Sequence, residues 1–190
     1  SEDKFKGYGV SACATCDGFF YKDKKVMVVG GGNTAVEEAL FLTNFASEVI
    51  LVHRRDELRA EKILQNKLFN HPKISAVWDS EVMEIIGEDN PPSVNSVLLK
   101  NVKNNSENKI MVDGIFIAIG HSPSSSIFKD KLEINKNGYI ITEPDSTITS
   151  VEGVFAAGDV TDEKYRQAVT AAGLGCMAAL EAENYLSSKE

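Results

Sequence analysis

Short apolar runs and amphipathic stretches alternate in the first third of the chain. Residues 26–29 (VMVV) follow a charged turn and predict a buried strand, and a second apolar run, VILVH, occupies residues 49–53. Between these runs, apolar side chains recur at the helical period over residues 34–45. Because parallel strands need a crossover between them, this order predicts a βαβ unit over residues 26–53.

The pattern changes after this unit. A second helix is expected from Asp56 to Asn70. Its inward-facing side chains would be those of Leu58, Ile63, Leu64 and Leu68. Beyond Pro72, β-rich segments separated by polar turns occupy residues 82–86, 94–102 and 110–117, which is typical of an antiparallel meander.

The last third of the chain opens with a loop at residues 120–123, a candidate domain boundary. A short strand is expected at residues 139–142, and a further apolar run at residues 154–157 leads into a Gly-Asp pair. Residues 165–187 predict a final helix rich in alanine. The predicted fold class is therefore α/β, with a Rossmann-like three-layer domain that includes an antiparallel β-meander.

The composition excludes several classes of protein. With 190 residues, 43% of them apolar and 25% charged, the chain can bury a core and is not expected to be disordered. Its 28 acidic and 20 basic residues leave a net charge of −8, which disfavours a general nucleic-acid binder. The apolar stretches are too short to span a bilayer, and the first residues lack the apolar core of a secretory signal. We therefore expect a cytoplasmic protein with no nucleic-acid or membrane partner.

The pattern G-x-G-x-x-[GA] occurs three times, and context separates the copies. Only the copy at Gly30, Gly32 and Ala35 leaves a predicted strand and opens a predicted helix, as a dinucleotide-binding fold requires. The first glycine permits the tight turn, the second lets the backbone approach a pyrophosphate, and the alanine keeps the helix close to the strand. The helix N-terminus, with Asn33 and Thr34, offers free N–H groups to the anion. The alternative is a βα turn without a ligand.

Basic residues stand at the end of the second predicted strand. An NAD site usually places Asp or Glu about 20 residues after the glycines, where it bonds the ribose 2′-hydroxyl. Here that place holds His53, Arg54 and Arg55, with Arg59 one turn later. Guanidinium groups pair with a 2′-phosphate, whereas a carboxylate would repel it. The sequence thus predicts a preference for NADP over NAD; the alternative is a solvated basic surface.

Cys13 and Cys16 have the spacing C-x-x-C, which favours redox or metal chemistry. A zinc site would need two more ligands, and the histidines are scattered along the chain, so we expect no metal. Two inert thiols are the remaining alternative. Asp17 is a candidate proton donor or acceptor for thiol–disulfide exchange. Cys176 is expected to be a small, buried packing residue.

Six sequence blocks stand in one order over nearly the whole chain: ACATCDGFFY, GGGNTAVEEAL, HRRDELRAEKIL, AIGHSP, GVFAAGDV and YRQAVTAAGLGCMAAL. Together they closely resemble the low-molecular-weight thioredoxin reductases of bacteria. The resemblance implies an NADPH-dependent flavoprotein that forms a homodimer, with one FAD and one redox-active disulfide per subunit. It implies that electrons pass from NADPH through FAD to the Cys13–Cys16 disulfide and then to thioredoxin.

The resemblance also implies roles for individual residues. Cys13 and Cys16 would be the redox pair, and Asp17 the acid–base residue. The implied NADPH contacts are Gly30, Gly32, Asn33, Thr34, Ala35, His53, Arg54, Arg55, Arg59, Ile119 and Gly120. The implied FAD contacts are Gly158, Asp159, Arg166, Gln167 and Ala168.

The family has two dinucleotide-binding domains, and its FAD domain begins with its own strand, glycine turn and helix. No such unit precedes Ser1 in this sequence. We therefore expect a fragment that is inactive by itself. It would hold a complete NADPH-binding domain over residues 1–120 and the C-terminal part of the FAD-binding domain over residues 121–190. In the family, the NADPH domain rotates about a two-stranded hinge, which would fall here before Gly9 and near residues 121–123.

Three alternatives stay open at this point. The flavoprotein subunit of alkyl hydroperoxide reductase shares the glycine turn, the C-x-x-C pair and the Gly-Asp block, but it prefers NADH, and the basic run argues against it. A nucleotide-binding module without turnover is a second alternative. A zinc-bound interaction module is the third.

Overall fold

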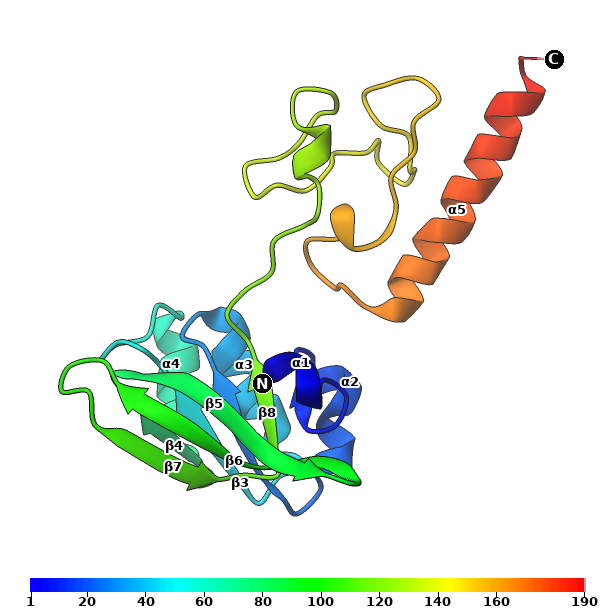
Figure 1. The fold of residues 1–190 in the computed structure, drawn as a ribbon. Coiled ribbons are helices and arrows are strands. Elements are labelled where there is room, and N and C mark those ends of the chain that lie inside the picture. Colours follow the sequence, from blue (N-terminus) through cyan, green and yellow to red (C-terminus); the bar gives the residue numbers. More distant parts are fainter. Residues whose placement is uncertain (190) are drawn as a thin grey trace. The chain divides into compact units, whose positions relative to one another are not determined.

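A computed structural model describes residues 1–189 and divides the chain into two compact units (Figure 1). The first unit runs from Ser1 to Gly120, and the second begins at His121. The first contains two β-sheets with helices, whereas the second consists of loops, short 3-10 turns and one long helix. No helix in this described part of the chain is long and apolar enough to cross a membrane.

A five-stranded parallel sheet forms the centre of the first unit, in the order β1-β8-β2-β3-β4. Its strands are β1 (Val10–Ser11), β2 (Lys25–Val29), β3 (Glu48–Val52), β4 (Ile74–Val77) and β8 (Gly114–Ile117). Helix α3 (Asn33–Leu42) connects β2 to β3, and Val26 pairs with Val49 across these two strands. The predicted βαβ unit is therefore confirmed, with its helix ending at Leu42 rather than at Phe45.

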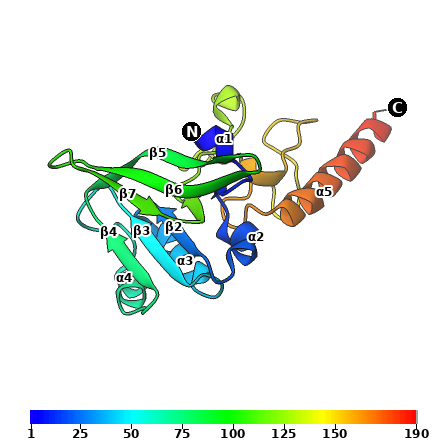
Figure 2. The ribbon, with the colours of Figure 1, turned by 60° about the horizontal axis from the view of Figure 1, so that its bottom comes forward.

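Helices α3 and α4 (Lys62–Phe69) cover one face of the parallel sheet (Figure 2). Alternate residues of the strands, among them Val26, Val28 and Leu51, belong to the apolar cluster on this side. Parallel strands are usually covered on both faces, which is why these strands are almost continuously apolar in sequence.

The predicted helix over residues 56–70 is too long, because α4 begins only at Lys62. The preceding residues bond to the turn before α3 instead of to a helix of their own. The N–H of Arg59 donates to the carbonyl oxygen of Gly31 (2.7 Å), and the N–H of Glu61 donates to Oδ1 of Asn33 (2.8 Å). Of the four side chains expected to face inward, those of Leu58 and Leu68 are buried, that of Leu64 is half-buried and that of Ile63 is exposed.

An antiparallel sheet covers the other face of the parallel sheet. It consists of β5 (Ser80–Asp89), β6 (Pro92–Asn101) and β7 (Glu107–Met111) in that order. Met27 and Ile115 of the parallel sheet share an apolar cluster with Val97 and Leu99 of β6. The meander is confirmed, but its expected third segment, residues 110–117, is two strands. The chain turns at Asp113, so that β7 ends the meander and β8 enters the parallel sheet.

The shorter elements of the first unit precede β2. They are α1 (Glu2–Phe5), α2 (Ala14–Asp17) and the 3-10 turn η1 (Gly18–Tyr21). Phe5 of α1 is buried in the apolar cluster between the two sheets. Helix α1 thereby packs the first residues of the chain against β5 and β6.

In the described residues of the second unit, β-structure is limited to isolated bridges. They pair Ile134 with Ile140, Thr142 with Thr149, and Ile148 with Phe155. The predicted strand over residues 139–142 is therefore wrong, since this segment takes part in bridges to two different partners rather than in a ladder. The unit also contains the 3-10 turns η2 (Ser126–Phe128) and η3 (Gly158–Val160) and the helix α5 (Ala168–Ser187).

Helix α5 starts three residues later than the pattern indicated, for a local reason. The carboxylate of Asp162 accepts hydrogen bonds from the N–H groups of Lys164, Tyr165 and Arg166, which hold this stretch in a turn. These bonds lower the pKa of Asp162, although burial acts in the opposite direction. Gln167 then caps the helix in a capping box with Thr170.

Truncation of Phe5 is expected to destabilise the first unit. Its side chain is 1% exposed, so Phe5→Ala should lower the free energy of unfolding by about 3–5 kcal/mol. Phe20 is 69% exposed, and Phe20→Ala should stay within about 0.5 kcal/mol of the wild type. Denaturant unfolding followed by the fluorescence of Trp78, the one tryptophan of the sequence, reports on this unit. Equal losses for the two variants would contradict the packing described for α1.

Candidate functional site

The carboxyl ends of parallel strands meet at one edge of a sheet, which is where α/β proteins bind their ligands. In this sheet β1 leads to the C-x-x-C pair, β8 to Ile119, β2 to Gly30 and β3 to His53. The order β1-β8-β2-β3 therefore places the cysteines, residues 118–120, the glycine turn and the basic run at successive positions along one edge.

Gly30 makes the exit from β2. A Cβ atom at this position would lie 2.3 Å from the carbonyl oxygen of Ala118 and 2.7 Å from the Cβ of Ala35. The N–H of Gly30 donates to the carbonyl oxygen of Val52 (3.0 Å). There is no space for a side chain here, because β8 and the first turn of α3 both lie against the backbone.

Gly32, in contrast, borders open space. Among the described residues, and apart from the adjoining chain, no heavy atom lies within 4 Å of a Cβ built at this position. Gly32 is the N-cap of α3, and among the described residues no side-chain capping bond is made there. The first N–H groups of an uncapped helix are free to bind an anion. The side chain of Asn33 accepts the N–H of Glu61 at Oδ1, so that its Nδ2 group is the part that could donate to such an anion.

Gly31 packs against the imidazole of His53. A Cβ at position 31 would lie 2.3–2.5 Å from Cε1, Nδ1 and Nε2 of the ring. The side chain of His53 is 6% exposed, and within residues 1–189 its Nε2 has no hydrogen-bond partner. Sequence analysis did not assign a role to Gly31. The signal available was the run of three glycines, one more than the pattern requires.

The basic run is held in place from two sides. On one side, the N–H groups of Arg59 and Glu61 hydrogen-bond to the glycine turn, at the carbonyl oxygen of Gly31 and at Oδ1 of Asn33. On the other side, Nζ of Lys103 lies 2.8 Å from a carboxylate oxygen of Asp56 and 3.0 Å from one of Asp79. These pairs lower the pKa of Asp56 and raise that of Lys103. Lys103 therefore draws the carboxylate of Asp56 towards the meander.

A cavity of about 550 Å³ lies beside the glycine turn and the basic run, within the first unit. Five of the predicted NADPH residues line it, namely Gly30, His53, Arg54, Arg59 and Ile119. The other six, Gly32, Asn33, Thr34, Ala35, Arg55 and Gly120, are not part of its lining. β5 also contributes Ser80, Glu81 and Met83 to the lining, and none of these residues was predicted from the sequence. A solvent-facing β-strand carries no motif that would have marked these residues.

Electrostatics keep His53 neutral. Burial lowers the pKa of its imidazole, and the positive charges of Arg55, Arg59 and Arg54 lower it further. A hydrogen bond to the backbone of Glu57 acts in the opposite direction and is outweighed. The imidazole is therefore uncharged at neutral pH.

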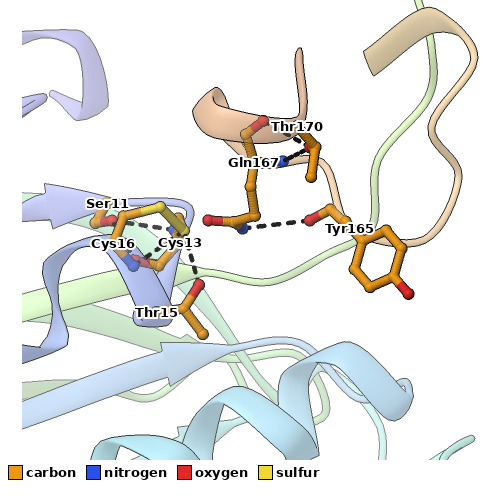
Figure 3. Close-up of a disulfide and its surroundings, with 7 residues drawn as sticks. All are labelled: Ser11, Cys13, Thr15, Cys16, Tyr165, Gln167 and Thr170. Atoms are coloured by element: carbon orange, nitrogen blue, oxygen red, sulfur yellow. Dashed lines mark hydrogen bonds between the residues drawn. A yellow bond between two sulfur atoms is a disulfide. The ribbon is translucent and has the colours of Figure 1, made fainter. Parts of the chain in front are cut away.

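Cys13 and Cys16 form a disulfide at the start of α2 (Figure 3). The N–H of Cys16 donates to Sγ of Cys13 (3.2 Å), and the N–H of Cys13 donates to the hydroxyl of Ser11 (3.0 Å). Cys13 is half-buried and Cys16 exposed. An exposed disulfide in a four-residue loop is accessible to an attacking thiolate.

The surroundings of the disulfide are aromatic. Phe19 and Phe20 follow it in η1, and both are exposed. Phe19 contacts the ring of Phe45 edge-on, with centroids 6.1 Å apart. Asp17 is half-buried, and its N–H donates to the carbonyl oxygen of Cys13 (3.1 Å). The pKa of Tyr21 is raised, mainly by burial and in part by the charge of Asp17.

The remaining candidates belong to the second unit. Gly158 opens η3 with a φ of +78° and is buried, whereas Asp159 is exposed. Arg166 and Gln167 are half-buried and precede α5, which begins with Ala168. Figure 3 shows the bonds of the Gln167 backbone and side chain to Thr170 and Tyr165.

Two further findings concern candidate ligands and thiols. The expected burial of Cys176 is wrong, because this cysteine is exposed on α5 and is the free cysteine of the structure. Helix α5 has no buried residue, so a small side chain on it has no packing partner that excludes solvent. Within residues 1–189, no three His, Cys, Asp or Glu side chains gather into a group that could hold a metal ion.

Comparison with known proteins gives consistent matches. A family model described as pyridine nucleotide-disulphide oxidoreductase matches residues 1–175. A thioredoxin reductase of Rickettsia felis is 59% identical over 187 residues, which are 98% of this chain and 60% of that protein. A thioredoxin reductase of Vibrio cholerae is 56% identical over 196 residues, covering 100% of this chain and 61% of the relative.

Solved structures agree with these matches. The thioredoxin reductase of Streptococcus pyogenes MGAS5005 superposes with a TM-score of 0.92 at 45% identity, covering 99% of this chain and 60% of that one. The thioredoxin reductase of Lactococcus lactis, in its FR conformation, gives 0.69 at 42% identity, covering 99% and 61%. The chain thus spans about 60% of the length of the relatives that it matches.

Adjacent glycines of the turn should respond differently to a methyl group. Gly31→Ala forces a shift of the buried His53 ring and is expected to lower the free energy of unfolding by about 1–3 kcal/mol. Gly32→Ala enters open space and should change it by less than about 1 kcal/mol. Unfolding followed through Trp78 compares the two variants. A second substitution, His53→Ala, should restore part of the stability lost in Gly31→Ala; if it deepens the loss, the ring is not the obstacle.

Proposed function

Because the chain belongs to the pyridine nucleotide-disulphide oxidoreductase family, we propose that the protein is an NADPH-dependent thioredoxin reductase. The observation that carries the proposal is the sharing of one sheet edge by an accessible C-x-x-C disulfide and a cavity beside a glycine turn that Arg54 and Arg59 line. The relatives named thioredoxin reductase support it through their identity to this chain.

The cavity fits NADPH in three respects. Gly32 leaves room beside the uncapped N-terminus of α3, where a pyrophosphate would bind. The guanidinium groups of Arg54 and Arg59 line the cavity and would pair with the 2′-phosphate. His53 adds a buried ring nitrogen that the described chain leaves without a partner. When bound, NADPH supplies two electrons as hydride.

FAD would be held in part by the second unit. The exposed carboxylate of Asp159 follows a glycine in a left-handed turn, and Arg166 and Gln167 precede the N-terminus of α5. That N-terminus would favour negative charge on a bound group. These residues would form one side of the flavin-nucleotide site, with Arg166 and the N-terminus of α5 supplying the positive charge. When bound, FAD accepts hydride and passes the electrons to a disulfide.

The cysteine pair performs the exchange with the protein substrate. In the reduced state, a thiolate of the pair attacks the thioredoxin disulfide and forms a mixed disulfide. The second cysteine then displaces the partner, so that the Cys13–Cys16 bond forms again and two thiols remain on thioredoxin. Asp17 exchanges the proton of the leaving or attacking thiol. The exposed rings of Phe19 and Phe20 give a protein partner an apolar surface beside the pair.

The proposal includes a change in the relative position of the two units, with one hinge near residues 121–123. The other hinge, expected before Gly9, would have to precede α1, because Phe5 is buried within the first unit. One dithiol has to meet both the flavin and a protein partner, and short connecting loops allow such rigid-body motion. A homodimer and a cytoplasmic location, where thiols are kept reduced, belong to the same proposal.

The two cysteines of the pair should be essential, and the third dispensable. In the full-length protein, Cys13→Ser and Cys16→Ser are expected to abolish NADPH-dependent reduction of thioredoxin, whereas Cys176→Ser retains it. In the 190-residue chain, thiol counting under native conditions should find one free thiol before reduction and three afterwards. A fully active Cys16→Ser enzyme would refute the relay. The 190-residue chain alone, with FAD added, is expected to show no turnover.

The arginines should decide between the two nicotinamide nucleotides. The full-length protein is expected to bind NADPH at least tenfold more tightly than NADH, about 1.4 kcal/mol. Arg54→Ala and Arg59→Ala should each remove most of this difference, because NADH lacks the phosphate they pair with. Lys67→Ala, which removes a positive charge on α4 outside the cavity, is the matched control and should leave both affinities unchanged. Equal affinities of the wild type for both nucleotides would contradict the assignment.

A further inference from the structure

His53 combines three properties that a packing residue does not need together. It is almost completely buried, it lines the cavity beside the glycine turn, and its Nε2 is left without a hydrogen-bond partner by the described residues. A buried polar nitrogen without a partner costs free energy. A hydrophobic side chain of similar size would fill the space over Gly31 without that cost.

We propose that His53 takes up a proton from solvent when a 2′-phosphorylated nucleotide enters the cavity, so that the imidazolium joins the arginines in holding the phosphate. The proposal rests on the function assigned above and deepens it, since it makes nucleotide choice depend on pH. The proton goes to Nε2, the nitrogen without a partner, while the other ring nitrogen keeps the bond to the backbone of Glu57.

The charges around the ring explain why the proton is absent before binding and present afterwards. Arg54, Arg55 and Arg59 are the groups that depress the pKa of His53, beyond the effect of burial itself. A phosphate dianion that pairs with these guanidinium groups cancels their repulsion and adds negative charge to the same cavity. The pKa of the imidazole therefore rises on binding.

Groups on the facing elements do not supply this negative charge themselves. β5 contributes Glu81 to the cavity lining, and the first residues of this sequence contribute Ser1 and Glu2. None of the three is among the causes that shift the pKa of His53 in the structure, and neither is the Glu57 carboxylate. The turn against which the ring packs carries only glycine at position 31.

The direction of the pH effect follows. Above the pKa of His53 in the complex, the imidazole is neutral in both states and contributes no linkage. As pH falls through that value, binding gains one proton and becomes tighter. The gain levels off below the lower pKa of the free protein, where the proton is already present. NADH brings no phosphate to this end of the cavity, so its affinity should lack this contribution.

The test compares wild type, His53→Asn and His71→Asn in the full-length protein. His53→Asn keeps a donor for Glu57 but cannot titrate. His71, whose Nδ1 accepts the N–H of Lys73 and which does not line the cavity, is the matched histidine control. Calorimetric titration with NADPH in two buffers of different ionisation heat, at several values between pH 5.5 and 8.5, gives the protons bound. The phosphate itself titrates near pH 6 in all variants, so the difference between variants isolates His53.

We expect the wild type and His71→Asn to bind up to one proton more with NADPH than His53→Asn does. The ratio of the His53→Asn and wild-type dissociation constants should rise as pH falls, by up to about tenfold for each unit of pKa shift. With NADH, the three proteins should bind equal numbers of protons. Equal proton uptake with NADPH in wild type and His53→Asn would overturn the inference.

Two measurements keep the test decisive. If His53→Asn fails to fold, a nitrogen-shift NMR titration of the wild type, with the His53 resonance assigned, must show a higher pKa for His53 with NADPH than with NADH. An unchanged pKa refutes the proton uptake. If Arg54→Ala loses the preference for NADPH but wild type and His53→Asn take up equal numbers of protons, this inference is refuted and the proposed function is not. Failure of NADPH to bind refutes the proposed function as well.

Discussion

The site of the first unit depends on the absence of two side chains at the turn between β2 and α3. At Gly30 the carbonyl of Ala118 lies where a Cβ would be, and at Gly31 the ring of His53 does. A side chain at either position would push β8 or the basic run away from β2. Because both segments also line the cavity, its shape is set by how closely three pieces of backbone approach one another.

This close approach is sustained by burial on both faces of the parallel sheet. Along β2, Val26 and Val28 belong to the apolar cluster beneath the helices, whereas Met27 belongs to the cluster beneath the meander. All three are fully buried, so the strand cannot tilt without opening one of two close-packed layers. The position of the turn that follows β2 is therefore fixed by the packing of this strand, and the loops at this edge are positioned by the same packing.

The sequence predicted what depends on periodicity and local turn chemistry. The alternation of apolar runs located β2, α3 and β3, and the glycine pattern in that context located the turn. It failed where distant contacts decide: residues 56–61 bond to the glycine turn rather than forming helix, and the apolar run 110–117 divides between two sheets at Asp113. The wall of the cavity from β5 was invisible for the same reason, since Glu81 and Met83 reach it only through the tertiary fold. The prediction that Cys176 is buried was wrong because it assumed that other residues cover the helix, whereas no residue of α5 is buried.

The order of the strands gives the site its functional logic. With β1, β8, β2 and β3 side by side, the disulfide follows the outermost strand β1 and the basic run follows β3, and both are attached to the same sheet. Their separation is therefore fixed by strands that do not move relative to one another. A displacement of the whole first unit would carry the nucleotide cavity and the cysteine pair together and would disturb neither. Such a displacement changes only what faces this edge, while the residues along the edge keep their positions relative to one another.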